Sequence, residues 1–139
     1  MAQTAPSVAS AAWDAATSAR ARSVSCTCRV LRYFTERNDG LGERLQAAFP
    51  SLKLVKAFNT VGAAFFVRPT FAQGRGSMFI AGNDADAKAA VAGLIEAWGW
   101  QPYDVGRIEG ARVTEPLCQL WCLPGFLRND WAHAFQVIA

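Results

Sequence analysis

The sequence predicts an α/β fold in which helices flank a short, mostly parallel sheet. Apolar runs of strand length alternate with segments whose apolar residues recur at helical spacing, and Gly, Pro or Asn ends most of these runs. Of the 139 residues, 52% are hydrophobic and 18% are charged, which is enough apolar surface for one core. Alternating strands and helices are typical of a three-layer unit with helices on both faces of the sheet. We expect this unit to span residues 41–139.

The first half of this unit is predicted to contain a helix, a strand and a short helical turn. Apolar residues recur at helical spacing over 41–49, and Pro50 ends that segment. Residues 52–58 form a compact apolar run of strand length. The next run, 61–67, could turn helically before the loop that follows it.

The middle of the chain shows the clearest pattern, a strand, a helix and a second strand. A buried strand is expected at residues 78–81. The helix that follows begins at Asn83 or Asp84, whose side chains favour the start of a helix, and ends at Gly99. Residues 102–106 are predicted to form the second strand.

The carboxyl-terminal part is predicted to be helical and then aromatic. A helix is expected over residues 111–123, with Pro116 in its first turn or kinking it. The remaining residues, 124–139, carry several aromatic side chains and could end in a short helix that begins at Asp130.

Residues 1–40 differ in composition from the rest of the chain. They are rich in Ala, Ser, Thr and Arg, and their apolar residues keep no sustained period. We expect a poorly ordered leader that is loosely attached to the core. An organellar transit peptide over residues 1–32 is the alternative, because such peptides are rich in Arg and Ser and poor in acids. Otherwise the expected location is the cytoplasm.

Charge, hydropathy and cysteine content exclude several classes of protein. The net charge of +3 comes from basic residues that are scattered singly, unlike the basic stripe of a nucleic-acid-binding protein. The longest uncharged apolar stretch, residues 57–67, is too short to cross a membrane, so a soluble protein is expected. Cys26, Cys28, Cys118 and Cys122 lack the spacing of a metal site, and we expect reduced thiols.

Neither glycine pair in the chain completes a dinucleotide-binding loop. Such a loop needs three glycines in the pattern Gly-x-Gly-x-x-Gly, directly after a strand. Gly40-Leu-Gly42 and Gly74-Arg-Gly76 both lack the third glycine, so we expect loop glycines there. His133 is expected to be a packed aromatic residue, and no residue is predicted to act as an acid, base or nucleophile.

Two small polar residues, Asn59 and Thr60, follow the predicted strand 52–58. In open α/β sheets, ligands bind at the carboxyl ends of the strands, which would make this segment a binding site. Asn and Thr also form local turns through their side chains, so a structural role is equally compatible with the pattern.

Several segments together resemble the second half of the NADP oxidoreductases that depend on the deazaflavin coenzyme F420. They are Lys56–Gly62, Met78–Asp84, Ala87–Val91, Trp98–Gly106, Ala111–Arg112, Glu115–Leu117 and Leu120–Trp121. The closing segments Trp121–Phe126 and Trp131–Phe135 resemble one branch of that family. The likeness runs from about Gly40 to the end of the chain.

The resemblance implies a Rossmann-like unit that lacks the amino-terminal dinucleotide-binding βαβ. Family members transfer hydride directly between the ring of NADP and the deazaflavin, without an acid, base or metal. By this resemblance Asn59, Thr60 and Gly62 would face the two rings, and the region Glu109–Trp121 would lie nearby. The implied cofactors are NADP and either coenzyme F420 or a flavin, with a homodimer as an expected assembly.

Two functional hypotheses follow. The first is a shortened NADP oxidoreductase that transfers hydride to coenzyme F420 or a flavin-like acceptor and is inactive alone, because the phosphate loop is missing. The second is a non-catalytic remnant that acts as an interaction or dimerisation module through its aromatic tail.

Overall fold

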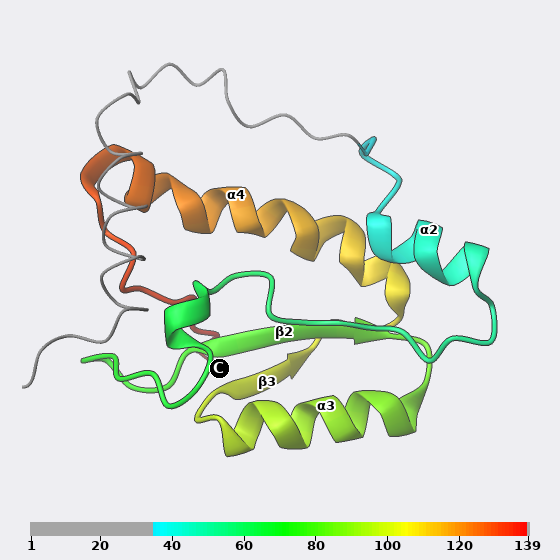
Figure 1. Ribbon diagram of the computed structural model, residues 1–139, viewed down its shortest axis with the longest axis horizontal. Helices are drawn as coiled ribbons and strands as arrows, with labels where there is room; N and C mark the ends of the chain where they lie inside the picture. Colours follow the sequence, from blue (N-terminus) through cyan, green and yellow to red (C-terminus); the bar gives the residue numbers. More distant parts are fainter. Residues whose placement is uncertain (1–34, 139) are drawn as a thin grey trace, which may run out of the picture. The chain divides into compact units, whose positions relative to one another are not determined.

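The computed structural model describes residues 35–138, which belong to one compact unit, Leu31–Ala139. Most of the leader and the transit-peptide alternative therefore lie outside the described residues. In chain order the elements are α2 (Leu41–Ala48), β1 (Val55–Lys56), η1 (Ala63–Phe65), β2 (Ser77–Gly82), α3 (Ala85–Ala97), β3 (Gln101–Asp104), η2 (Ile108–Gly110) and α4 (Ala111–Arg128) (Figure 1).

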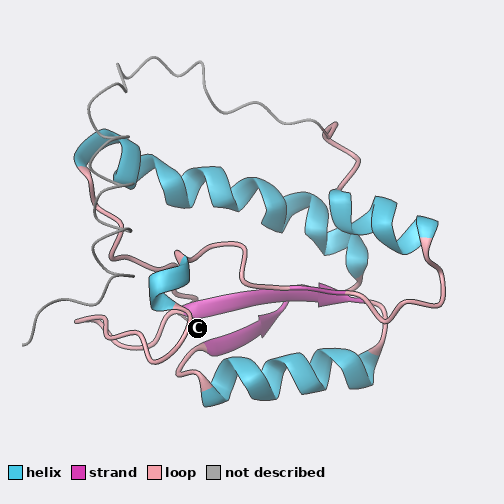
Figure 2. Ribbon diagram, in the orientation of Figure 1, coloured by secondary structure: helices cyan, strands magenta, loops and turns pink. Residues whose placement is uncertain are grey.

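The three strands form a mixed sheet in the order β1-β2-β3 (Figure 2). Strands β2 and β3 are parallel, with Ser77 opposite Gln101, and α3 connects them. Strand β1 is antiparallel to β2, with Val55 opposite Gly82. The α/β prediction is confirmed, but the sheet contains one antiparallel pairing and one parallel pairing where a mostly parallel sheet was expected.

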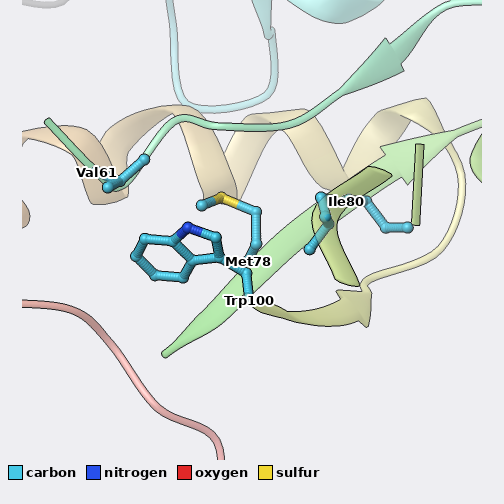
Figure 3. Packing of buried hydrophobic residues seen from close by; sticks show 5 residues of the cluster. Val61, Met78, Ile80 and Trp100 are labelled. Atoms are coloured by element: carbon cyan, nitrogen blue, oxygen red, sulfur yellow. The ribbon is translucent and has the colours of Figure 1, made fainter. Parts of the chain in front are cut away.

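Helices lie on both sides of the sheet, as a three-layer unit requires. In Figure 1, α3 runs along one face of the sheet and α4 along the other. Met78, Ile80, Ile95 and Trp100 are buried in the core together with Val61. Figure 3 shows Val61 beside Met78 and the Trp100 ring. Each of these large side chains contributes about 1.5–3 kcal/mol by leaving water, so this cluster holds the layers together.

The predicted strand 52–58 is shorter in the structure. Only Val55 and Lys56 pair with β2, and Phe58 adopts a φ of 53°, a left-handed conformation that cannot continue a strand. The helical turn expected within 61–67 is present as the 3₁₀ helix η1.

Helix α4 continues past its predicted end and includes both Pro116 and Pro124. It ends at Asn129, which takes the left-handed conformation with a φ of 57° and donates its N–H to the Gly125 carbonyl. The helix was expected to end at Leu123, yet Gly125 is a buried helical residue whose missing side chain makes room for the Trp131 ring.

The short helix predicted to begin at Asp130 does not form. The chain is irregular there because its backbone bonds to the start of β2 instead. Ser77 donates its N–H to the Phe135 carbonyl at 2.7 Å, and the Ser77 hydroxyl accepts the Val137 N–H at 2.9 Å. The tail is thereby held beside the amino end of β2.

Within residues 35–138, no helix combines the length and the apolar character that a membrane span requires.

Candidate functional site

The direction of β1 changes where the predicted site residues lie. Because β1 is antiparallel to β2, the segment that follows Lys56 runs toward the amino end of β2. Asn59 and Thr60 therefore do not lie at the edge where β2 and β3 end. The expected position of this segment at the carboxyl edge of a parallel sheet is therefore wrong, because β1 runs opposite to β2.

Asn59 connects the segment after β1 to helix α4. Its side-chain amide donates to the carbonyl of Thr114 at 2.5 Å and to that of Glu115 at 3.1 Å. Because this contact spans more than fifty residues, the Asn59 side chain does not form a local turn. Its amide nitrogen is already bonded and is not free to bind a ligand. The Asn59 Oδ1 atom accepts no hydrogen bond from any residue within 35–138.

Thr60 and Gly62 lie beside the same helix. Thr60 is 3% exposed, and its hydroxyl makes no hydrogen bond to another described residue. Gly62 lies under the Trp121 ring, where an added Cβ would be 3.1 Å from the ring carbon Cη2. The structure thus brings the three predicted residues together, with Gly62 required by packing and two polar atoms, Asn59 Oδ1 and Thr60 Oγ1, left unused by the described protein.

The glycine pair Gly40-Leu-Gly42 binds a carboxylate of the same chain. The N–H groups of Leu41 and Gly42 donate to the two carboxylate oxygens of Glu115 at 2.8 and 2.9 Å. An added Cβ at Gly42 would lie 3.0 Å from that of Ala111, so the glycine also lets α2 approach α4 closely. These glycines begin helix α2, where the amino terminus favours a negative charge.

A hollow of about 720 Å³ lies at the carboxyl end of β2, the edge where ligands bind in many α/β proteins. It is lined by Glu43, Gln46, Ala47, Pro50, Ser51, Leu52, Lys53, Asn83, Asp84, Ile108 and Glu109. These residues come from three separate stretches of the sequence, 43–53, 83–84 and 108–109, which is why no local pattern grouped them. Of these residues, only Asn83 and Asp84, which follow β2 directly, were singled out from the sequence, as the start of a helix.

Asp84 is the helix-start residue that the sequence predicted. Its Oδ1 atom accepts the Ala87 N–H at 2.8 Å, and its Oδ2 atom lies 2.9 Å from Lys53 Nζ. The Ala87 N–H, followed by Lys53, lowers the pKa of Asp84 below its usual value. The amino terminus of α3 is therefore occupied by a charged carboxylate at neutral pH.

The hollow does not suit a phosphate group. Glu43, Asp84 and Glu109 line it, against the single cation Lys53, which is paired with Asp84. Glu43 in turn pairs with Arg112. A dianionic ligand in this hollow would be repelled by the lining carboxylates, because like charges disfavour binding.

His133 is packed as the sequence predicted. Its ring stacks on Trp121 with a centroid distance of 5.1 Å, and its Nε2 atom lies 2.9 Å from the Trp121 carbonyl. The Trp121 indole N–H donates to the His133 carbonyl at 3.0 Å. These reciprocal contacts hold the tail against α4. The other ring nitrogen, Nδ1, lies 3.6 Å from a carboxylate oxygen of Asp130.

Cys118 and Cys122 lie one turn apart on α4 as half-buried free thiols. Burial and the neighbouring Cys118 raise the pKa of Cys122 to about 11, so it is protonated at neutral pH. Within residues 35–138 no cluster of three or more His, Cys, Asp or Glu side chains could hold a metal ion. Cys26 and Cys28 lie outside the described residues.

Comparison with known proteins identifies a solved structure that superposes on most of this chain. A crystal structure from Arthrobacter sp. FB24, described as an F420-dependent NADP reductase, is 34% identical to the chain and superposes with a TM-score of 0.71. The superposition covers 83% of this chain and 52% of that one. The chain is similar to an NADP reductase. This likeness confirms the resemblance inferred from the sequence.

Two further proteins show partial likeness. Metalloreductase STEAP3 from Rattus norvegicus is 34% identical over 89 residues, which are 61% of this chain and 18% of that protein. A hypothetical protein from Sinorhizobium meliloti is 36% identical, with a TM-score of 0.44, over 50% of this chain and 35% of that one. No protein-family profile matches the chain. The chain thus spans about half of the NADP reductase and less than a fifth of the metalloreductase.

Proposed function

We propose that this chain is the second portion of an NADP-dependent oxidoreductase. When it is joined to a dinucleotide-binding half, the assembled protein transfers hydride between NADP(H) and coenzyme F420 or a flavin. The observation that carries the proposal is the superposition on the NADP reductase, which combines 34% identity with coverage of 83% of this chain. We expect the protein to work in the cytoplasm, a reducing compartment that keeps Cys118 and Cys122 as thiols.

The described residues fit the ring portion of such a cofactor better than its pyrophosphate. A pyrophosphate is usually bound by free N–H groups at a helix amino terminus. Here the amino terminus of α2 is occupied by Glu115 and that of α3 by Asp84. We therefore assign phosphate binding to the other half of the assembled protein.

The ring would be recognised by Asn59, Thr60 and Gly62. The carbonyl oxygen of Asn59 and the hydroxyl of Thr60 bond to no other residue within 35–138, so they would bond to a carboxamide or a ring carbonyl. Gly62 lets the Trp121 ring pack close to the backbone beside them. When bound, the cofactors supply the hydride donor and acceptor. The protein residues would orient the rings, a contribution that needs no proton transfer from the chain.

A titration of the full chain with NADPH tests whether phosphate binding belongs to the other half of the assembled protein. We expect binding weaker than micromolar, because the amides that would hold the pyrophosphate are occupied by carboxylates. Calorimetry gives both affinity and stoichiometry. One-to-one binding at micromolar concentration or tighter would show that the assignment of phosphate binding to another half is wrong.

A chimera tests the ring site. The first half of the Arthrobacter reductase is fused before Gly40, and NADPH oxidation is followed with a deazaflavin or a flavin as acceptor. We expect turnover, and we expect Thr60→Val to lower kcat by about 5- to 150-fold, the loss for an unpaired polar group of about 1–3 kcal/mol. Thr70→Val, on an exposed loop residue, is the matched control.

The outcomes of the chimera assay separate the hypotheses. A folded chimera that binds NADPH but reduces neither acceptor would reject hydride transfer and favour the alternative of a non-catalytic interaction module. If the chimera is active and its folded Thr60→Val variant keeps the full kcat, the ring site is rejected but hydride transfer is not. Circular dichroism and thermal melting establish the folded fraction in each case.

A further inference from the structure

Two free thiols lie side by side on helix α4. Cys118 and Cys122 are four residues apart, so their Cβ atoms lie about 5–6 Å from each other on the same side of the helix. Both residues are half-buried. The buried residue Thr114 lies four residues before Cys118, and the buried residue Gly125 lies three residues after Cys122. The two cysteines, which we call the α4 thiol pair, therefore lie along the covered face of the helix.

The sulfur atoms of the α4 thiol pair interact with each other. The pKa of Cys122 is raised to about 11, first by burial and then by the neighbouring Cys118, through its charge and through a hydrogen bond between the two side chains. Both effects of Cys118 require that the two sulfur atoms lie close together. The pair is thus a contact between two thiols and not merely a repeat in the sequence.

A regular helix keeps the α4 thiol pair from forming a disulfide. A disulfide needs Cβ atoms about 3.5–4.5 Å apart, whereas residues one turn apart on a helix have Cβ atoms about 5–6 Å apart. Closing the bond would therefore distort this turn of α4. The folded helix holds the two thiols close to each other but open.

The surroundings of the pair do not suit a reactive nucleophile. Reactive cysteines have a lowered pKa and lie near a cation or at the amino terminus of a helix. The α4 thiol pair lies in the middle of an 18-residue helix, and the pKa of Cys122 is raised. The basic residues of α4, Arg112 and Arg128, are each six residues away from the pair. A role in nucleophilic catalysis is therefore not supported.

The geometry suits a metal ion held between the two sulfur atoms. Zinc–sulfur bonds are about 2.3 Å long, so a cation of similar size between two sulfurs spans up to about 4.6 Å, a separation that two cysteine side chains reach across one helical turn. Thiolates favour Cu(I) and Zn(II). Structural Zn(II) takes four ligands, and no group of three or more His, Cys, Asp or Glu side chains supplies them within residues 35–138. Cu(I) is satisfied by two thiolates.

We propose that the α4 thiol pair binds one Cu(I) ion. Binding breaks the two S–H bonds, releases two protons to the solvent and forms two Cu–S bonds, and no electron is transferred. The bound site carries one negative charge, which is easier to hold in a half-buried place than the two charges of a bare pair of thiolates. The proposal does not depend on hydride transfer.

A copper titration tests the site. Cys26 and Cys28 are also thiols, so the starting protein is the full chain with Cys26→Ser and Cys28→Ser. Cu(I) is added without oxygen in the presence of bathocuproine disulfonate, a chelator whose Cu(I) complex is coloured, and the loss of colour reports copper taken by the protein. We expect one Cu(I) per chain. Adding either Cys118→Ser or Cys122→Ser should abolish the uptake, because a single thiolate cannot hold the ion against the chelator.

A displaced thiol is the matched control. In the starting protein, Cys122→Ser combined with Leu123→Cys keeps two thiols on α4, but it sets them five residues apart and about 140° apart around the helix. Leu123 is an exposed position, so the change should leave the fold intact, which thermal melting verifies. We expect no uptake. If this variant takes copper as well as the starting protein does, the helical spacing does not create the site and the proposal is wrong.

Oxidation provides a measurement that does not use copper. The folded starting protein is treated with diamide and then alkylated, and its mass is determined. We expect two alkylated thiols, because the helix prevents the disulfide. A disulfide within the chain would show that the two side chains lie closer than a regular helix allows, and it would overturn the geometry on which the site rests.

Two further outcomes would reject the copper site. The first is a folded starting protein that takes up no Cu(I). The second is a full chain that binds one Zn(II) through all four cysteines and loses all metal binding in the starting protein. That result would assign the α4 thiol pair to a site of four thiolates.

Discussion

The two ends of strand β2 are built differently. At its amino end, Gly76 fits between Trp100 and Ala134, and the tail bonds to Ser77. At its carboxyl end, the chain leaves a hollow in which exposed charges such as Lys53 form ion pairs. None of Asn59, Thr60 and Gly62 lines this hollow, so the binding candidate inferred from the resemblance and the open hollow are separate. Substitutions at the two ends should therefore affect stability to very different degrees.

Gly76→Ala should have the largest effect. An added Cβ would lie 2.6 Å from the Trp100 ring and 2.7 Å from the Ala134 Cβ, both within a packed region. We expect a loss of about 2–3 kcal/mol in the free energy of unfolding, the upper part of the range for overpacking. Urea denaturation measures this loss.

Gly93→Ala is the matched control for Gly76→Ala. It adds the same methyl group on α3, where nothing lies within 4 Å of the new Cβ. It should stabilise the chain by about 0.5–1 kcal/mol, because Ala favours a helix over Gly. If the two variants have equal stability, the amino end of β2 is not as tightly packed as the contacts indicate.

Asn59→Ala should have an intermediate effect on stability. The substitution removes the amide that donates to the carbonyls of Thr114 and Glu115. We expect a loss of about 1–2 kcal/mol in the free energy of unfolding. Asn38→Ala, at an exposed position, is the control. If Asn59→Ala is as stable as the control, the Asn59 amide does not stabilise the fold.

Lys53→Ala at the carboxyl end should have the smallest effect on stability, because exposed ion pairs contribute little. Its effect should be visible in the titration of Asp84. The pKa of Asp84 should rise when Lys53 is lost but stay below the usual value of 3.8, since the Ala87 N–H is the larger cause of the lowered pKa. Carboxyl chemical shifts followed by NMR measure this pKa, and a return to 3.8 would contradict the assignment.

The parts of the fold that local sequence determines were predictable. Strand β2 and helix α3 were expected because their apolar residues follow clear periods, and Asp84 gave the helix start. The direction of β1 was not predictable, because a short apolar strand can pair parallel or antiparallel. Contacts with the rest of the fold determine which pairing forms. The end of α4 was missed because Pro124 usually marks a stop, whereas Gly125 here packs against Trp131 within the helix.

Asn59 and Thr60 were singled out by their position after a predicted strand, and Gly62 and the expected role of all three in ring binding came from the family resemblance. The structure places the three residues beside α4. Their partners Thr114, Glu115 and Trp121 are distant in sequence, so no local pattern could indicate them.

The carboxylate of Glu115 at the start of α2 also has a consequence for the order of folding. Helix α2 has eight residues, and isolated helices shorter than about 12–15 residues are marginal in water. Its first N–H groups are satisfied by a residue 74 positions away. The helix therefore cannot be stable until α4 has assembled, and its amides should gain protection in pulsed hydrogen exchange after those of β2 and α3. Within residues 35–138, the first helix in sequence is thus among the last to become stable.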